Sequence, residues 1–488
     1  MDITGTTADS GQQQMGLNII SSDSGKRFDL NEMPFIYFIG AGGIGMSALI
    51  RYFLAKGKVV AGYDRTPSAL TEQLIEEGIA IHYTADVTLI PYGFRNKNKT
   101  CVVYTPAVPS SHEELIYFRE HGFTILKRSQ ILGLITAVAR SLCVAGTHGK
   151  TTTSSMAAHL LKQSHVDCNA FLGGILKNYN NNLLLSDHND LVVIEADEYD
   201  RSFHFLTPYM AVVTSVDPDH LDIYGTPQGY RESFEKFTSL IRPGGALIMK
   251  KGIELTPVLQ PDVRLFTYSI TDETADFYTT NIRIGNGEII FDMVAPGVCI
   301  PNIQLGVPVR TNIENGVAAM ALALLNGVTP DEICAAMKTF AGAKRRFDCL
   351  VKTDRLVYID DYAHHPQELI SCIRSVKELY KGRRVTGVFQ PHLYTRTRDF
   401  ADEFASALSL LDRLLLLDIY PAREEPIPGI TSGMILNKVT ISDKMLCKKE
   451  DLVATLEKEA IDVLVTFGAG DIDRLVEPIR TMLNIKKA

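Results

Sequence analysis

The residues that most clearly predict chemistry form a short loop at positions 146–153, with the sequence Gly-Thr-His-Gly-Lys-Thr-Thr-Thr. It is a shortened phosphate-binding loop, because the full pattern GxxxxGK[ST] would require glycine where Val144 stands. Backbone N–H groups of such a loop hold phosphate oxygens, Lys150 neutralises charge at the β- and γ-phosphates, and the Thr151 hydroxyl can bind Mg²⁺. The predicted nucleotide site consists of Gly146, Thr147, His148, Gly149, Lys150, Thr151 and Thr152.

A second glycine-rich loop, at positions 40–45, reads Gly-Ala-Gly-Gly-Ile-Gly and separates a predicted strand from a predicted helix. Glycines there allow a tight turn and let backbone N–H groups approach a diphosphate at a helix N-terminus. Asp64 lies at the end of the next predicted strand, where dinucleotide-binding folds place an acid that contacts the ribose. This loop predicts a diphosphate-bearing nucleotide, and taken alone it leaves a nicotinamide oxidoreductase open.

Acidic residues and a histidine follow two later strands of the unit that carries the phosphate loop. Glu195 ends the apolar run 191–194, and His220 follows the strand around Val213. Carboxylate oxygens beside a phosphate loop suit Mg²⁺, whereas histidine is an unusual ligand for this ion. Glu198 is an alternative to Glu195, because it lies only three residues further on. Two phosphate-holding loops predict an enzyme that uses one nucleotide as energy source and another as a handle on its substrate.

Short β-branched runs alternate with helical patterns in three successive series that would position these loops. This alternation predicts parallel sheets covered by helices on both faces. The turn-rich stretch from about 266 to 307 predicts a small antiparallel patch. The predicted fold class is α/β with three domains: a Rossmann-like N-terminal domain, a central phosphate-loop ATPase domain and a Rossmann-like C-terminal domain. Strands are expected at 35–39, 59–64, 101–104, 141–145, 191–194, 211–213, 356–359, 385–389, 414–417 and 463–467.

The overall composition is that of an ordinary globular protein of about three domains. Its 488 residues carry a net charge of −8 with both signs interspersed, which argues against nucleic acid as a partner. Eight cysteines without a CxxC pair predict free thiols in a reducing compartment. No apolar stretch reaches the ~20 residues that cross a membrane. We therefore expect a cytoplasmic protein without a membrane span, preceded by a flexible tail at residues 1–33 that is rich in serine, glycine and glutamine.

Taken together, eight motifs resemble those of the Mur ligases in order and spacing, and the resemblance covers nearly all of the chain after the tail. Within that family they are most similar to the members that add L-alanine. The chain lacks an obvious counterpart of the carbamylated lysine found in the later-acting members. The motifs are segments 40–47, 146–153, 195–200, 217–222, 344–348, 360–366, 389–397 and 468–472.

The resemblance implies a UDP-sugar-binding domain at 34–139, a central ATP-binding domain at 140–343 and a C-terminal domain at 344–488 that closes over the site. It also implies ligation of L-alanine to the lactyl carboxylate of UDP-N-acetylmuramate through an acyl phosphate. ATP and two Mg²⁺ ions are the implied cofactors. The expected assembly is a monomer or a weak homodimer.

The resemblance further implies a role for individual residues. Lys150, Glu195, His220 and Arg346 are expected to be catalytic, with Thr151, Glu195 and His220 as the metal ligands. Asn312 and Asp361 are expected to contact the nucleotide, and Arg345 remains an alternative to Arg346. The family usually has His-Asn where this chain has Thr311-Asn312. The expected substrate-binding residues are Gly40, Gly42, Gly43, Gly45, Asp64, Thr105, His364, His365 and Arg396.

Three alternative functions remain open at this point. A related ligase that attaches a recycled peptide to the same UDP-sugar would need a roomier amino-acid pocket. A nicotinamide oxidoreductase would use Gly40–Gly45 and Asp64, but the second phosphate loop argues against it. A non-catalytic nucleotide-binding module would not need Lys150, Thr151, Glu195 and His220 together.

Overall fold

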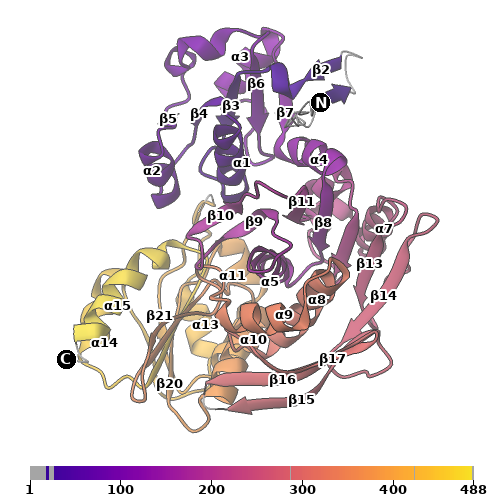
Figure 1. Cartoon of the computed structure of the whole chain (residues 1–488). Helices are drawn as coiled ribbons and strands as arrows, with labels where there is room; N and C mark the ends of the chain where they lie inside the picture. Colours follow the sequence, from indigo (N-terminus) through magenta and orange to yellow (C-terminus); the bar gives the residue numbers. More distant parts are fainter. Residues whose placement is uncertain (1–17, 21–26, 286, 423, 486–488) are drawn as a thin grey trace, which may run out of the picture.

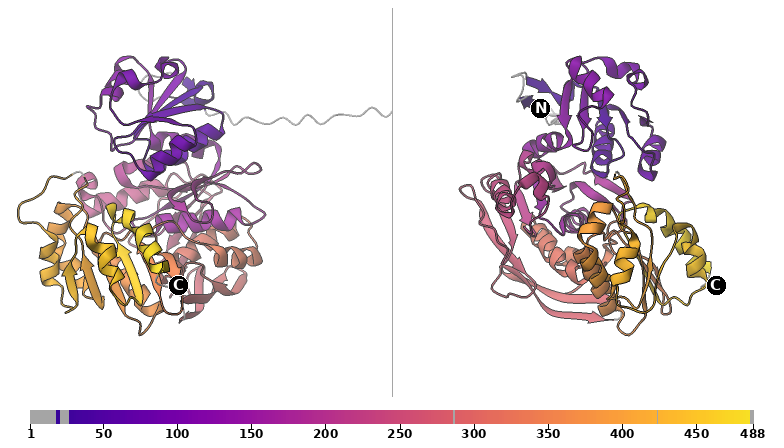
Figure 2. Two further views of the ribbon diagram at one scale, coloured as in Figure 1. Left: turned by 90° about the vertical axis from the view of Figure 1, so that its left-hand side faces the viewer. Right: turned by 180° about the vertical axis from the view of Figure 1, so that it is seen from behind.

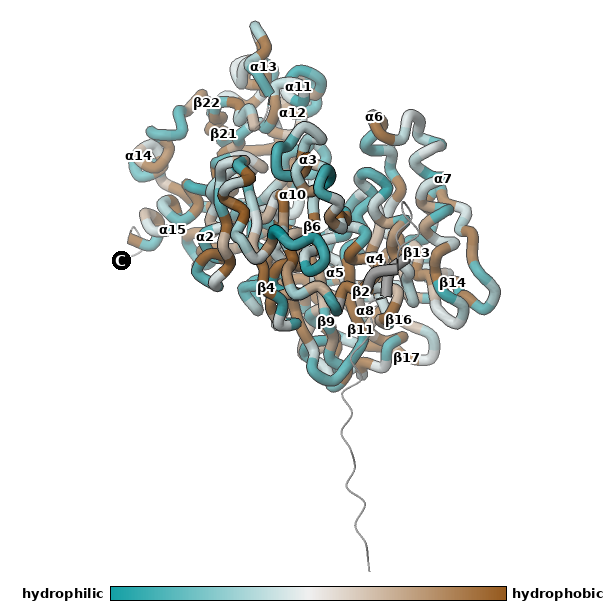
Figure 3. The backbone as a smooth tube through the Cα atoms, turned by 90° about the horizontal axis from the view of Figure 1, so that it is seen from above, coloured by the Kyte–Doolittle hydropathy of each residue, from teal (hydrophilic) through white to brown (hydrophobic). Residues whose placement is uncertain are grey.

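Three large sheets follow one another along the chain in the computed structural model, after a short two-stranded ladder (Figure 1). The structure describes residues 18–20, 27–285, 287–422 and 424–485. Figure 2 shows the N-terminal sheet above the central one, with the C-terminal sheet beside the central one. Hydrophobic residues concentrate along the strands, and hydrophilic residues along outlying loops (Figure 3). The predicted α/β class with three domains is therefore confirmed. Among the described residues, no helix is both long and apolar enough to cross a membrane.

The N-terminal sheet has five parallel strands in the order β5-β4-β3-β6-β7. The central strand β3 is buried on both faces, as its continuous apolar sequence predicts. Strands β4 and β5 lie on one side of β3, and β6 and β7 lie on the other. The strand order therefore reverses at β3, and the glycine loop after it lies at the switch point where α/β sheets bind ligands. The elements are β3 (Phe35–Ile39), α1 (Ile44–Ala55), β4 (Val59–Tyr63), α2 (Ala69–Glu76), β5 (Ala80–His82), β6 (Thr100–Tyr104), α3 (Glu113–Glu120), β7 (Thr124–Lys127) and α4 (Arg128–Val138).

The predicted flexible tail is only partly open to description, because residues 1–17 and 21–26 lie outside the described residues. Strand β1 (Asn18–Ile20) pairs with β2 (Arg27–Asp29) in an antiparallel ladder. Leu30 and Met33 are buried in the same hydrophobic core as α1. The tail prediction is therefore wrong for this last part, because the two apolar side chains anchor it to the N-terminal domain.

The central sheet has ten strands in the order β10-β9-β11-β8-β12-β13-β14-β15-β16-β17. Its parallel core comprises β8 (Arg140–Ala145), β9 (Asn169–Leu176), β11 (Leu191–Glu195), β12 (Met210–Val213), β13 (Ala246–Lys250) and β14 (Arg264–Ser269). The predicted antiparallel patch is present as β15 (Phe277–Gly285), β16 (Glu288–Ala295) and β17 (Val298–Gln304). At the opposite edge, β10 (Asn181–Leu184) pairs antiparallel with β9, and the sequence pattern did not predict this hairpin.

Alternate residues of β8 enter two different hydrophobic cores. Leu142 and Val144 pack on one face with α5 (Lys150–Lys162), α8 (Arg310–Leu325) and α9 (Pro330–Thr339). Cys143 and Ala145 pack on the other face with α7 (Pro227–Thr238) and with the N-terminal domain. A strand whose two faces are both covered must be apolar throughout, which explains the uninterrupted Leu-Cys-Val-Ala run.

The C-terminal sheet has six strands in the order β18-β19-β23-β20-β21-β22, of which only the edge strand β18 runs antiparallel to its neighbour. Its strands are β18 (Asp348–Lys352), β19 (Val357–Asp361), β20 (Val385–Phe389), β21 (Arg413–Leu416), β22 (Lys444–Leu446) and β23 (Val463–Phe467). Its α-helices are α10 (Pro366–Leu379), α11 (Tyr394–Asp399), α12 (Ala401–Leu408), α13 (Ser432–Lys438), α14 (Leu452–Glu457) and α15 (Val476–Ile485). Asp361 ends β19 and faces the central domain across the cavity described below.

A buried carboxyl group lies inside the N-terminal domain. Tyr37 donates its hydroxyl hydrogen to Glu114 Oε2 at 2.7 Å, and His82 Nε2 lies 3.5 Å from Glu114 Oε1. Burial raises the pKa of Glu114 to about 7, because the charged form loses its water. Between pH 4.5 and about 7, Glu114 is therefore protonated in the folded state and ionised in the unfolded chain.

We expect Glu114→Gln to change how stability depends on pH. The pKa of Glu114 is higher in the folded state, so its contribution is fully present below the unfolded pKa of 4.5 and is lost as pH rises through about 7. A neutral amide avoids this loss, which is on the order of 3 kcal/mol. The Tm difference between variant and wild type should therefore move in favour of the variant from pH 5 to pH 8 in thermal unfolding. A difference that stays constant with pH would contradict this assignment.

Candidate active site

The phosphate loop connects β8 to α5, as the sequence predicts. Gly146 (φ 136°) and Gly149 (φ 81°) both adopt backbone conformations that side chains disfavour. A Cβ atom at Gly149 would lie 2.5 Å from Asn315 Oδ1, so the loop passes close to α8. The two glycines therefore shape the loop and allow the first turn of α5 to pack against α8.

Lys150 is held by acceptors on either side of it. Its Nζ donates to the Gly146 carbonyl oxygen at 2.6 Å and to Glu198 Oε1 at 2.8 Å. Glu198 is almost fully buried; burial raises its pKa, and the charge of Lys150 opposes this shift. The lysine thus lies at the mouth of the loop, paired with a carboxylate that a phosphate group would have to replace.

Glu195 lies directly beside the phosphate loop. Its Oε1 accepts a hydrogen bond from Thr151 Oγ1 at 3.0 Å, and its Oε2 accepts one from the Gly173 N–H at 3.1 Å. Burial raises the pKa of Glu195, while the positive charges of Lys150 and Arg346 lower it. A hydroxyl and a carboxylate at hydrogen-bonding distance are the oxygen donors that Mg²⁺ prefers, so these two residues fit the implied ion.

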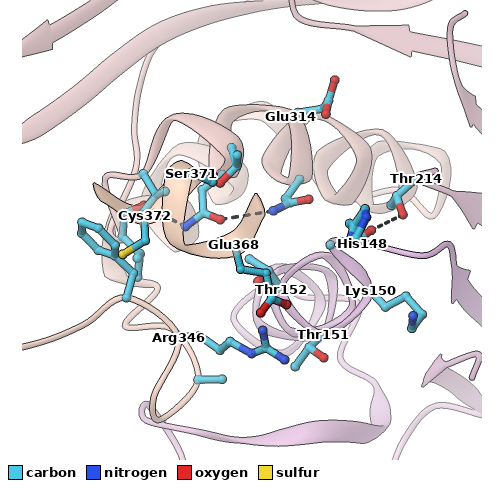
Figure 4. Close-up of a pocket in the computed structure, with 18 of the residues that line it drawn as sticks. His148, Lys150, Thr151, Thr152, Thr214, Glu314, Arg346, Glu368, Ser371 and Cys372 are labelled. Carbon is cyan, nitrogen blue, oxygen red and sulfur yellow. Dashed lines mark hydrogen bonds between the residues drawn. The ribbon is translucent and has the colours of Figure 1, made fainter. Parts of the chain in front are cut away.

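These residues line a cavity of about 560 Å³ between the central and C-terminal domains (Figure 4). Both domains contribute to the walls: the phosphate loop and α8 on one side, and the start of α10 on the other. The predicted residues that the structure brings together here are Thr147, His148, Gly149, Lys150, Thr151, Thr152, Glu195, Asn312, Arg346 and Asp361. Gly146 does not line the cavity, but its carbonyl oxygen accepts a hydrogen bond from Lys150.

The part of the cavity next to α8 is lined by amides. Asn312 donates to the Val307 carbonyl oxygen at 3.2 Å, and its Oδ1 accepts from Asn315 Nδ2 at 3.2 Å. Thr311 also lines the cavity, at the position where the family usually has histidine. The wall therefore keeps polar groups that can reach a base, with a smaller side chain at position 311.

The adjacent arginines Arg345 and Arg346 point to different places, which the sequence left undecided. Arg345 Nε donates to the buried Asp360 Oδ2 at 3.0 Å, and its Nη2 donates to the Gly468 carbonyl oxygen at 2.6 Å. Arg346 is exposed and lines the cavity. Arg345 therefore holds the C-terminal domain together, and Arg346 is the one that can contact a phosphate.

Asp361 is fixed by the backbone around it. Its Oδ2 accepts from the Phe347 N–H at 2.7 Å, and its Oδ1 accepts from the Ala363 N–H at 2.8 Å. Burial raises its pKa to about 6, and the positive charge of Arg346 opposes this shift. The carboxylate thus ties the chain that carries Arg346 to the end of β19.

Four basic side chains of the C-terminal domain form a second cluster that does not line the cavity. Arg396 Nη1 lies 3.3 Å from His392 Nδ1, the rings of His364 and His392 are 6.1 Å apart, and His365 packs on Phe400. Burial lowers the pKa of Arg396, while the carboxylates of Glu368 and Asp219 raise it. The cluster of His364, His365, His392 and Arg396 therefore faces the loop that contains Asp219.

His220 is also outside the cavity. It adopts a left-handed backbone (φ 51°) before the short helix α6 (Leu221–Tyr224), and its ring lies edge-on to Tyr199 at 5.2 Å. In the part of the chain that the structure describes, no three His, Cys, Asp or Glu side chains lie close enough together to form a metal site. The structure therefore places Thr151 and Glu195 together, without His220.

The glycine loop after β3 is held by Asp64. The carboxylate accepts a hydrogen bond from the Gly42 N–H at 2.6 Å, and a Cβ atom at Gly40 would meet Thr105 at 2.8 Å. The structure thus gathers Gly40, Gly42, Gly43, Gly45, Asp64 and Thr105 around one turn. Asp64 supports the loop itself, which is a contact that its position at the end of β4 did not indicate.

Two cations at the start of α4 were missed by the motif analysis. Arg128 Nη2 donates to Asp197 at 3.2 Å, and Lys127 Nζ donates to Asp200 at 2.8 Å. A Cβ atom at Gly45 would lie 2.6 Å from Arg128 Nη1, so this guanidinium group lies against the glycine loop. The only signal in the sequence was a basic pair between a strand and a helix, which is too common to be diagnostic.

A phosphate loop facing a buried carboxylate, in a cavity between two α/β domains, defines a nucleotide-dependent enzyme that works between domains. Three family models match in succession: "Mur ligase family, catalytic domain" at 35–140, "Mur ligase middle domain" at 144–323 and "Mur ligase, glutamate ligase domain" at 345–472. The chain belongs to the Mur ligase family. This assignment replaces the nicotinamide oxidoreductase and the non-catalytic module as interpretations.

Relatives with similar sequences share one name. A UDP-N-acetylmuramate--L-alanine ligase of Parabacteroides distasonis is 67% identical over 455 residues, covering 93% of this chain and 98% of the relative. A protein of the same name from Flavobacterium johnsoniae is 48% identical and covers 93% of this chain and 99% of the relative. The crystal structure of UDP-N-acetylmuramate-alanine ligase from Thermotoga maritima matches with a TM-score of 0.77 at 26% identity, over 92% of this chain and 99% of that one.

We expect the two arginines to give opposite phenotypes when replaced. Arg345→Ala removes the positive charge paired with the buried Asp360, which keeps its hydrogen bond from Thr466. This should cost about 3–5 kcal/mol of stability and lower the Tm. Arg346→Ala removes an exposed charge that faces the cavity, so the Tm should hold while kcat falls about 10²-fold. Differential scanning fluorimetry and a phosphate-release assay measure the two effects.

Arg346→Lys is the matched control for this pair, because it keeps the charge and loses the planar fork. Its kcat should lie between those of the wild type and Arg346→Ala. The assignment is wrong if Arg345→Ala lowers kcat at an unchanged Tm.

Proposed function

We propose that the chain joins L-alanine to the lactyl carboxylate of UDP-N-acetylmuramate, with hydrolysis of ATP to ADP and phosphate, in peptidoglycan synthesis. The observation that carries this function is the cavity in which Lys150, Thr151 and Glu195 of the central domain face Arg346 of the C-terminal domain. The very similar relatives that bear the alanine ligase name support it. A recycling ligase that adds a preformed peptide is less consistent with them.

ATP would bind with its phosphates on the loop 146–152 and its base beside Asn312, with Asp361 contributing from the closing domain. Its γ-phosphate would take the place of Glu198 at Lys150. Thr151 and Glu195 would hold a Mg²⁺ ion, which neutralises charge on the phosphates. For His220 to bind a second ion, it would have to move toward the cavity, because it lies outside it here.

The reaction requires one anion to attack another, so positive charge must be concentrated at the site. The substrate carboxylate oxygen attacks the γ-phosphorus, and the bond to the β-phosphate oxygen breaks to release ADP. The uncharged amine of L-alanine then attacks the acyl carbonyl carbon. The tetrahedral intermediate expels phosphate, and the nitrogen loses a proton. Lys150 and Arg346 stabilise the charge that develops on the transferring phosphoryl group.

The anionic groups of the other two substrates, a diphosphate and a carboxylate, would occupy the two remaining clusters. The diphosphate of the UDP-sugar would lie on the loop of Gly40, Gly42, Gly43 and Gly45, with Arg128 supplying a positive charge that the loop itself lacks. The carboxylate of L-alanine would pair with Arg396, near His364 and His365. A planar guanidinium fork is well matched to either anion. The enzyme would act in the cytoplasm as a monomer or weak homodimer.

We expect phosphate release only when ATP, Mg²⁺, UDP-N-acetylmuramate and L-alanine are all present. Supplying each amino acid in turn tests the assignment, and release that requires a preformed peptide would indicate the recycling ligase instead. No release with any combination would contradict the proposed function.

Lys150→Ala should lower this release by at least about 10²-fold, because the transferring phosphoryl group loses its cation. Binding of UDP, measured by calorimetry, should stay within about threefold of the wild-type Kd, since the glycine loop lies in another domain and is not touched by Lys150. Circular dichroism controls for folding. A folded variant that no longer binds UDP would contradict this division of roles.

A further inference from the structure

The hairpin formed by β9 and β10 packs on α1 of the N-terminal domain, and Asn182 of β10 makes three of the hydrogen bonds between them. The Asn182 side chain is fully buried. Its Nδ2 donates to the Ile44 carbonyl oxygen at 2.6 Å and to Ser47 Oγ at 3.0 Å, and its Oδ1 accepts from Arg51 Nη1 at 2.9 Å. Both amide hydrogens and the carbonyl oxygen are thus used to hold α1.

The contact is made with the first turn of α1, directly after the glycine loop. Ile44 is the first residue of α1, and Ser47 also donates to its carbonyl oxygen at 2.8 Å. One turn further on, the buried Arg51 is held by Glu77, with Nε–Oε2 at 2.8 Å and Nη2–Oε1 at 2.7 Å. The end of α1 that would carry the diphosphate is therefore fixed to the central domain by a fully paired network.

The same hairpin holds the catalytic carboxylate. The Gly173 N–H of β9 donates to Glu195 Oε2 at 3.1 Å, and a Cβ atom on this glycine would collide with the Glu195 carboxylate. Leu183, the neighbour of Asn182, pairs with Phe171, two residues before Gly173. Only a short stretch of paired backbone therefore separates Gly173, which contacts Glu195, from Asn182, which contacts α1.

We propose that Asn182 is a positioning residue that sets the distance between the first turn of α1 and Glu195. This inference rests on the proposed function, in which the diphosphate lies at α1 and the carboxylate must reach the γ-phosphate beside Glu195. The diphosphate and the lactyl carboxylate belong to one substrate molecule, the UDP-sugar. The distance between α1 and Glu195 therefore decides whether the lactyl carboxylate is placed for attack. A misplacement of about 1 Å costs on the order of 10²-fold in rate.

The test separates catalysis from binding in Asn182→Ala. We expect kcat for phosphate release to fall by about 10–100-fold. The Kd of UDP and the Kd of ATP, each measured alone by calorimetry, should stay within about threefold of wild type, because each ligand contacts its own domain. A residue that matters only for folding would lower the Tm without this separation of kcat from Kd.

Leu184→Ala is the matched control on the same strand. Its side chain is buried in the core on the α5 face, with no hydrogen bond to α1 among the described contacts. It should lower the Tm, because the truncated side chain leaves a cavity, while kcat below the Tm stays within about threefold. Ser47→Ala removes the Asn182–Ser47 and Ser47–Ile44 hydrogen bonds but keeps the bonds of Asn182 to Ile44 and Arg51, so it should lower kcat less than Asn182→Ala does.

Each outcome bears on one proposal only. The positioning role is overturned if Asn182→Ala keeps the wild-type kcat, or if its UDP affinity falls as much as its kcat. If Asn182→Ala does not fold, Ser47→Ala decides: a lower kcat with unchanged UDP binding supports the role, and an unchanged kcat overturns it. Failure of the wild-type protein to bind UDP would instead contradict the proposed function.

Discussion

The structure depends on neutralising four acidic side chains at and just after the end of β11. Glu195, Asp197, Glu198 and Asp200 lie within six residues; Glu198 is buried and Glu195 is partly buried. Buried carboxylates are costly unless they are paired or hydrogen-bonded. Their partners come from separate parts of the chain: Thr151 and Lys150 from the phosphate loop, and Arg128 and Lys127 from the start of α4. The acidic segment 195–200 thereby contacts both the nucleotide site and the N-terminal domain.

The same charges prepare the site for its ligands. Lys150 is already oriented by Glu198, so a γ-phosphate would exchange one anion for another instead of ordering a free side chain. The C-terminal domain adds positive charge to the cavity through Arg346, whereas Arg345 is tied to Asp360. Lys177 of the β9–β10 hairpin pairs with Asp348 at 2.5 Å, which links this domain to the hairpin that supports Glu195.

The layered fold explains why these contacts can form. One core of the central sheet continues into the C-terminal domain and the other into the N-terminal domain. A strand such as β8 serves both, because successive side chains point to opposite faces. The phosphate loop follows the carboxyl end of β8, where the C-terminal domain approaches it. The cavity is therefore lined by residues more than two hundred positions apart.

The sequence by itself determined the features that depend on local backbone geometry. The parallel strands, the two glycine loops and the antiparallel patch follow from short patterns, since glycine spacing and apolar runs act within a few residues. The resemblance to Mur ligases came from motifs of the same local kind. Domain boundaries near 140 and 344 stay predictions.

Only the tertiary structure decided which side chains meet. It separated Arg345 from Arg346, turned Asp64 toward its own loop, left His220 outside the cavity and anchored the end of the predicted tail through Leu30 and Met33. It also brought Asn182 to α1, 135 residues away from Ser47 in sequence. These contacts depend on side-chain direction and on pairing between distant elements, and no short sequence pattern encodes either.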